Sequence, residues 1–127
     1  MADWVLDASA VLALMRAEPG AGAVADALPT AKLASVNAGE VVARLIGEGV
    51  PADAAKLMVA GLGCPLVAVD AELGLRAGAL AAQASAQALS LGDRCCLALA
   101  ERDGATAMTA DRAWDGLGLP IKVALIR

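Results

Sequence analysis

The stretch that decides the fold is WVLDASAVLALMRAEPG, residues 4–20. Its first part, residues 4–7, is a short apolar run that ends in Asp7 and predicts a β-strand. The next part, residues 8–18, has the composition of a helix, and the Pro19-Gly20 pair stops it. A strand that passes directly into a helix is the repeating unit of a parallel α/β fold.

The same alternation continues along the chain. Strands are predicted over residues 32–36, 65–70, 105–111 and 121–126. Helices are predicted over residues 21–28, 37–49, 52–62, 71–88 and 91–104, and a short helical turn over residues 112–118. Strands separated by helices imply parallel βαβ units, so we expect a three-layer α/β/α Rossmann-like fold with a parallel β-sheet. Residues 1–127 fit a single domain.

The composition favours close-packed helices with small side chains. Hydrophobic residues make up 59% of the chain, but it has no Phe or Tyr and only two Trp. An odd count of three cysteines indicates a reducing compartment. Asp3 and Asp7 interrupt the first apolar run, so no signal peptide is expected. The apolar stretch 77–89 contains polar residues, so no membrane span is expected and a cytoplasmic protein is predicted.

The charged residues exclude several classes of function. The chain contains no histidine, which removes Ser-His and Cys-His catalysis and His-ligated zinc. A net charge of −4 argues against a surface that holds nucleic acid tightly by its phosphates. It does not exclude a small site that cleaves nucleic acid with the help of bound cations. Catalysis here must therefore use carboxylates, hydroxyls, thiols, amines or a metal.

Four carboxylates fall at equivalent positions in the predicted fold. Asp7 ends the first strand, Asp111 ends the strand 105–111, and Glu40 and Asp93 lie in the first turns of two helices. Ligands of an open parallel sheet bind at the carboxyl ends of the strands, so the four acids should meet at one edge. Each acid alone has a local explanation as a capping or turn residue. Together they repel one another, and Mg²⁺ or Mn²⁺ suits such an all-oxygen set. Metal-dependent hydrolysis of nucleic acid follows as a hypothesis.

Polar neighbours of the acids are candidates for a supporting role. Ser9 and Thr109 stand two residues from Asp7 and Asp111, and each can hydrogen-bond a carboxylate or a water, or act as a local cap. Asn37, three residues before Glu40, has the spacing of a helix N-cap. Four residues after Asp111 comes Asp115, a weaker candidate for a fifth acid.

Three arginines are candidates for phosphate or RNA contacts. Arg44 lies one helical turn after Glu40, and Arg94 and Arg112 directly follow two of the acids. Guanidinium groups bind phosphates well, although isolated arginines more often form surface ion pairs.

The adjacent pair Cys95 and Cys96 has a simpler explanation than thiol or zinc chemistry. Neighbouring helical residues point about 100° apart, and no second Cys or His pair exists to complete a zinc site. Buried free cysteine behaves as a small hydrophobic residue, so both are predicted to pack in the core.

Four segments together resemble a known family. The order VLDASAVLAL (5–14), SVNAGEVVARL (35–45), SLGDRCCLALA (90–100) and TADRAW (109–114) closely resembles a PIN-domain ribonuclease of the VapC toxin type, over essentially the whole chain. The resemblance implies a PIN fold and a Mg²⁺- or Mn²⁺-dependent endoribonuclease. Its acidic quartet would fall on Asp7, Glu40, Asp93 and Asp111 as catalytic and metal-binding residues. It also implies an RNA substrate, a homodimer and a cognate antitoxin protein that holds the enzyme inactive.

Three alternatives remain open at this point. A receiver-type domain also carries an acidic Mg²⁺ site, but it needs an acidic pair after the first strand and a lysine at the end of the last, where Lys122 stands at the start. A haloacid-dehalogenase-type phosphatase needs a second aspartate where this chain has Ser9. A catalytically silent PIN-fold binding module would keep the fold without the activity, and retention of all four acids weighs against it.

Overall fold

The computed structural model describes residues 3–127 and contains one parallel β-sheet. Its strands follow the order β3-β2-β1-β4-β5. Every neighbouring pair is parallel, which confirms the predicted sheet type. The strand bounds are β1 Trp4–Leu6, β2 Ala31–Ala34, β3 Leu66–Val67, β4 Thr106–Thr109 and β5 Val123–Leu125.

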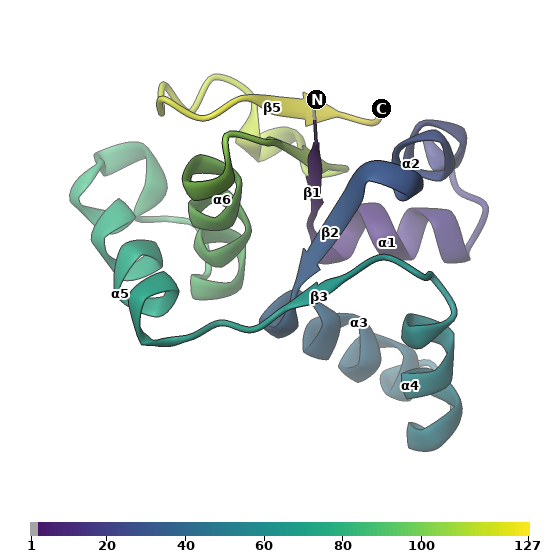
Figure 1. Cartoon of the computed structure of the whole chain (residues 1–127). Coiled ribbons are helices and arrows are strands. Elements are labelled where there is room, and N and C mark those ends of the chain that lie inside the picture. Colours follow the sequence, from purple (N-terminus) through teal and green to yellow (C-terminus); the bar gives the residue numbers. More distant parts are fainter. Residues whose placement is uncertain (1–2) are drawn as a thin grey trace.

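Helices cover both faces of the sheet, as the three-layer prediction requires (Figure 1). The core on one face contains side chains of α1 to α4, and the core on the other face contains side chains of α5 and α6. Short 3₁₀ turns complete the connections. The helical bounds are α1 Ala8–Met15, α2 Ala21–Ala27, α3 Ser35–Gly47, α4 Ala52–Ala60, α5 Ala71–Ala79 and α6 Leu91–Asp103, with the turns η1 Leu28–Thr30, η2 Leu80–Ala82, η3 Ala84–Ala86 and η4 Arg112–Trp114.

The central strand β1 sends alternate side chains into the two cores. Val5 belongs to the α5–α6 core and Leu6 to the α1–α4 core, and both are fully buried. Successive side chains of a strand point to opposite faces, so a strand covered on both sides reads as a continuous apolar run. This is the physical reason why residues 4–6 contain no polar side chain until Asp7.

The chain reverses its direction of travel across the sheet at β1. From β1 it passes first to β2 and β3 on one side, and later to β4 and β5 on the other. The gap between β1 and β4 is therefore the topological switch point, where the carboxyl ends of the strands leave a crevice for ligands. Asp7 follows β1 directly and Asp111 follows β4 by two residues.

The predicted long helix over residues 71–88 is wrong in its second half. Helix α5 ends at Ala79, and the chain continues through η2 and η3, with extended backbone at Gln83 between them. Leu80, Ala86 and Leu89 are buried in the core of that face. Two tight turns bring these three side chains inward, which overrides the helical propensity of the alanines.

Helix α6 carries the cysteine pair, and the prediction that both pack in the core is confirmed. Cys95 and Cys96 are 2% and 0% exposed. Burial raises the pKa of the Cys96 thiol well above its usual range, so the reactive thiolate is disfavoured. In the described part of the chain, no helix has the length and apolar character needed to cross a membrane.

Candidate active site

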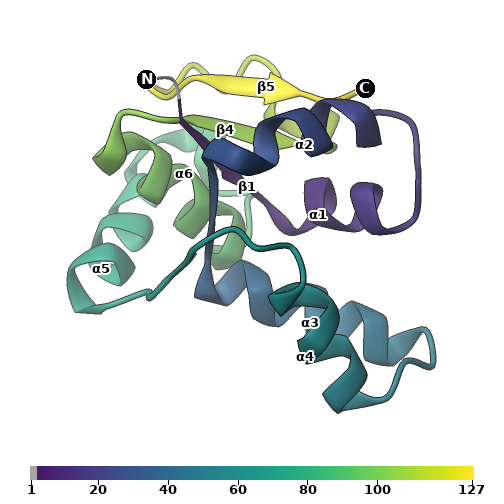
Figure 2. The ribbon, with the colours of Figure 1, turned by 45° about the vertical axis from the view of Figure 1, so that its right-hand side comes forward.

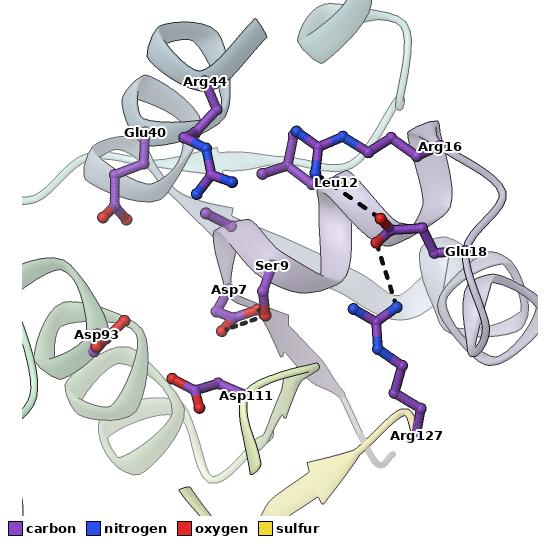
Figure 3. A pocket seen from close by; sticks show the side chains of 11 residues that line it. Asp7, Ser9, Leu12, Arg16, Glu18, Glu40, Arg44, Asp93, Asp111 and Arg127 are labelled. Atoms are coloured by element: carbon purple, nitrogen blue, oxygen red, sulfur yellow. Dashed lines mark hydrogen bonds and ion pairs between the residues drawn. The ribbon is translucent and has the colours of Figure 1, made fainter. Parts of the chain in front are cut away.

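A cavity of about 290 Å³ opens at the carboxyl ends of β1 and β4 (Figure 3). Its walls include all four acids that the sequence places at this edge. They come from four separate segments: the end of β1, helix α3, the first turn of α6 and the loop after β4. The lining residues are Asp7, Ala8, Ser9, Leu12, Arg16, Glu18, Glu40, Arg44, Asp93, Asp111 and Arg127.

Asp7 is the most firmly held of the acids. Its Oδ1 accepts from the backbone N–H of Ala10 at 2.8 Å, which makes it the N-cap of α1. The Ser9 hydroxyl donates to both carboxylate oxygens, at 2.7 and 2.9 Å, and the Thr109 hydroxyl donates to Oδ2. The backbone N–H of Ala110 donates to Ser9 Oγ at 2.9 Å. These bonds join the ends of β1 and β4 across the switch point.

Burial controls the charge of Asp7. The residue is 4% exposed, and loss of solvation raises the pKa of its carboxyl group from 3.8 to about 6. Hydrogen bonds from Thr109, Ala10 and Ser9 lower the pKa, while the negative charge of Asp93 raises it further. A cation in the cavity would offset both the burial and the repulsion.

Asp93 and Asp111 also have a local role at the start of a helix. Ser90 and Asp93 form a capping box: Asp93 N–H donates to Ser90 Oγ at 3.1 Å, and Ser90 N–H donates to Asp93 Oδ2 at 3.2 Å. Asp111 Oδ1 accepts from Ala113 N–H at 2.9 Å at the start of η4. Asp93 and Asp111 therefore each cap a helical segment and also line the cavity.

Glu40 is positioned by Asn37 and Gly92. The prediction that Asn37 is an N-cap is wrong, because α3 follows β2 directly and begins at Ser35, two residues earlier. Asn37 is fully buried within α3, and its Nδ2 donates to Glu40 Oε1 at 2.7 Å and to the Gly92 carbonyl at 3.1 Å. A Cβ atom on Gly92 would lie 2.7–2.8 Å from the Glu40 carboxylate. Only glycine therefore lets the start of α6 approach Glu40 so closely.

Three of the acids keep one carboxylate oxygen without a hydrogen-bond partner within residues 3–127. Their other oxygens accept the bonds described above, which leaves Oε2 of Glu40, Oδ1 of Asp93 and Oδ2 of Asp111. As they stand, no three acidic or cysteine side chains in this range lie close enough to hold one metal ion directly. The cavity has room for several waters, and Mg²⁺ retains several of its own waters when bound. The donor set and the space fit a hydrated divalent ion.

Sequence reasoning missed Arg16, Glu18 and Arg127, which also line the cavity. Arg127 follows β5, so the strand-end rule that located the acids also applies to it. Arg16 and Glu18 follow α1, which runs across the sheet edge rather than back along β1 (Figures 1 and 2). No local pattern indicates that tilt. With Arg44, the cavity has three arginines against five carboxylates, an excess of two negative charges when all are ionised.

Arg94, Arg112 and Asp115 do not line this cavity. Arg112 and Asp115 are exposed, and Asp115 borders a separate hollow of about 160 Å³ beside β5. The Arg94 Nε atom is buried without a hydrogen-bond partner in the described residues. Of the three arginines predicted to contact phosphates, only Arg44 faces the acids.

Comparisons with known proteins identify the family and the fold of the chain. The sequence matches the PIN domain family over residues 4–118. Among solved structures, DNA-bound VapBC from Salmonella typhimurium is similar at a TM-score of 0.73 and 13% identity, with all of both chains covered. VapBC2 from Rickettsia felis, bound to a DNA fragment from its promoter, is similar at a TM-score of 0.72 and 12% identity, covering 96% of this chain and 97% of that one. The search of curated proteins gave no significant match. Because the family match spans most of the chain, the chain belongs to the PIN domain family.

Proposed function

We propose that this protein is a Mg²⁺- or Mn²⁺-dependent endoribonuclease of the VapC toxin type, with Asp7, Glu40, Asp93 and Asp111 as its catalytic and metal-binding residues. One observation carries the proposal: four carboxylates from four segments line a single cavity, and three of them keep a free oxygen. Carboxylates that served only as caps would have no reason to share one cavity.

Residues of the chain prepare this site for phosphodiester hydrolysis. Ser9 and Thr109 keep the Asp7 carboxylate fixed, and Asn37 keeps Glu40 turned toward the start of α6. When bound, a divalent ion activates a water and neutralises charge on a phosphodiester. Fixed ligands limit the reorganisation required during the reaction, which is the usual benefit of hydrogen bonds to catalytic carboxylates.

Of the three alternatives raised by the sequence, two are now rejected and one remains. Membership of the PIN domain family replaces the receiver-type and phosphatase-type interpretations. A catalytically silent PIN module is the remaining competitor. It predicts RNA binding or partner binding without cleavage, so a direct assay distinguishes the two.

The test is cleavage of a mixed-sequence RNA by the purified protein in Mg²⁺, in Mn²⁺ and in EDTA. Asp7→Asn is the informative variant, because Asn caps a helix as well as Asp does but removes the charge. Asp70→Asn is its matched control, since Asp70 caps α5 through Leu73 N–H at 2.9 Å and lies outside the cavity. We expect metal-dependent cleavage that Asp7→Asn abolishes and Asp70→Asn leaves unchanged. Cleavage in EDTA, or full activity of Asp7→Asn, would refute the proposal.

A cognate antitoxin is the partner that we propose. Both structural neighbours are described as VapBC complexes, and the sequence resembles the VapC type. Expression of the protein should arrest bacterial growth, and coexpression of a small protein encoded next to it should relieve the arrest. If Asp7→Asn arrests growth as strongly as the unchanged chain, growth arrest does not come from this site and the toxin proposal fails.

The compartment and the oligomeric state remain predictions. Three free cysteines suit the reducing cytoplasm, where we propose that the protein acts on RNA. The homodimer follows from the resemblance alone, and light scattering of the purified protein tests it.

A further inference from the structure

An ion-pair network lies beside the acids, at the junction of α1, α3 and β5. Arg16 contacts Glu18 at 4.0 Å and Glu48 at 2.6 Å, and Arg127 contacts Glu18 at 3.3 Å. Arg127 also donates to the Pro19 carbonyl at 3.0 Å. Figure 3 shows Arg16, Glu18 and Arg127 on the side of the cavity opposite Asp93. One carboxylate thus holds two guanidinium groups at the cavity wall.

The backbone fixes this arrangement. Ala17 N–H donates to the Leu14 carbonyl and Glu18 N–H to the Ala13 carbonyl, which closes α1 with a Schellman motif. That motif requires a left-handed residue, and Ala17 supplies it with a φ of 52°. Within residues 3–127, Ala17 is the one residue other than glycine with a positive φ. Such strain persists only where the surroundings enforce the conformation, and it is frequent at functional sites.

The α1–α2 loop is also locked to the segment after β5. Gly20 has a φ of 96°, and a Cβ atom there would lie 2.6–2.9 Å from atoms of Ile126. Since Arg127 follows Ile126, this close approach brings its side chain beside Glu18. Two segments that are distant in sequence therefore combine to build one wall of the cavity.

The network leaves donors available for a ligand. A guanidinium group has five N–H donors, and each of these arginines uses only some of them on carboxylates. The side chains of Arg16 and Arg127 are 29% and 37% exposed. Arg44 lines the same cavity and has no carboxylate within ion-pair distance in the described chain. The wall is thus a preorganised set of cationic donors, which suits the oxygens of phosphate groups.

We propose that Arg16, Arg44 and Arg127 bind the phosphates of a single-stranded RNA next to the phosphodiester that is cleaved. This inference rests on the proposed function. Arg44 lies beside Glu40, and Arg16 and Arg127 lie around Glu18 on the side of the cavity away from Asp93 (Figure 3). A strand with its reacting phosphate above Asp7, Asp93 and Asp111 therefore extends past Arg44 toward Arg16 and Arg127. The arginines bind the substrate without participating in the chemistry. Their loss should therefore weaken binding and leave the rate at saturation nearly unchanged.

Arg16→Gln and Arg127→Gln test the inference, with Arg76→Gln as the matched control. Arg76, on α5, also contacts two carboxylates, Glu72 at 3.9 Å and Glu101 at 3.3 Å. Its side chain is 39% exposed, a fraction similar to the 37% of Arg127, but it lies outside the cavity. The control therefore removes a comparable ion-pair network and a comparable charge.

Binding is measured by fluorescence anisotropy with a labelled single-stranded RNA of about 12 nucleotides, a length within the range bound by single-strand sites. The Asp93→Asn background prevents cleavage, and salt is varied. Each cavity variant should raise Kd about three- to tenfold and reduce the slope of log K against log salt by about 0.7. In the cleaving protein, KM should rise by a similar factor while kcat stays within about twofold. A role limited to folding would not change the salt slope.

The result that overturns the inference is a Kd and a salt slope for both cavity variants equal to those of Arg76→Gln. If the unchanged chain cleaves RNA and this result is found, the endoribonuclease proposal stands and the phosphate site fails. If no cleavage occurs but binding depends on Arg16 and Arg127 as described, the phosphate site stands and the endoribonuclease proposal fails.

Discussion

Gly92→Ala should displace Glu40 without unfolding the protein. The added Cβ atom would lie 2.7 Å from Glu40 Oε1 and 2.8 Å from Cδ and Oε2. Ordinary contacts begin near 3.5 Å, so the carboxylate must retreat by roughly 0.7–1 Å. The obstructing atoms are the end of a flexible side chain, which can rotate away. When it rotates, the Glu40 carboxylate leaves the position in which it accepts the 2.7 Å hydrogen bond from Asn37.

The expected loss is in activity rather than in stability. A displacement of about 1 Å at a catalytic group reduces rates by up to about 100-fold, so we expect kcat to fall about 10- to 100-fold. An alanine in a helix stabilises by about 0.5–1 kcal/mol relative to glycine, which offsets part of the strain. The midpoint of urea denaturation should therefore change little. Mn²⁺ binding, followed by electron paramagnetic resonance, should weaken in parallel with cleavage.

Two glycine controls and one rescue complete this experiment. Gly39 and Gly78 are helical, and a Cβ atom on either would have no neighbour within 4 Å. Gly39→Ala and Gly78→Ala should preserve activity and stabilise slightly. Glu40→Asp shortens the obstructing side chain, so adding Gly92→Ala to that variant should reduce cleavage and Mn²⁺ binding much less than it does in the unchanged chain. Unchanged cleavage and Mn²⁺ binding in Gly92→Ala, or equal costs in both backgrounds, would refute the reasoning.

Three further predictions concern stability. Ala17→Gly should stabilise by about 0.5–1 kcal/mol in urea denaturation, because glycine adopts the left-handed conformation without steric strain; a lower midpoint would contradict this. Thr109→Val removes a buried hydroxyl that donates to Asp7, so it should destabilise by about 1–3 kcal/mol in urea denaturation. Thr109→Ser keeps the hydroxyl and loses only one buried methyl group, so it should destabilise by about 0.8 kcal/mol; a Thr109→Val midpoint equal to that of the unchanged chain would argue against the bond. The Arg102 side chain and Lys32 lower the pKa of the Asp103 carboxyl below 3.8 in the folded protein. The ionised Asp103 therefore contributes to the free energy of unfolding above pH 3.8, and this contribution is lost as pH falls through the folded pKa. Asp103→Asn should therefore destabilise by up to about 0.5 kcal/mol at pH 7, a difference that disappears in acid.

Much of the fold and the acidic part of the site could be predicted because both depend on short-range patterns. Apolar runs ending in Asp7 and near Asp111 locate the strand ends, and the strand-end rule then brings these acids together. The break after Ala79 could not be predicted, because burial of Leu80 and Ala86 in the core of that face decides it and the local sequence is helical. Tertiary packing, rather than propensity, sets that boundary.

The remaining part of the site depends on contacts that no spacing reveals. Asn37 has the spacing of a cap, and only the immediate passage from β2 to α3 shows that it lies inside the helix. The importance of Gly92 depends on the distance between two helices, and helical patterns do not contain that distance. Arg16 and Glu18 reach the cavity through the tilt of α1, which packing determines.

The hydrogen bonds from backbone N–H groups to Asp7, Asp93 and Asp111 make the ends of three helical segments sensitive to what the cavity contains. The amides of Ala10, Ser90 and Ala113 exchange with solvent only when these bonds open. A ligand that fixes the carboxylates will slow exchange at these three amides, in proportion to how tightly it binds. Hydrogen–deuterium exchange can therefore rank metals, RNA fragments and inhibitors on the unlabelled protein, without any assay of cleavage.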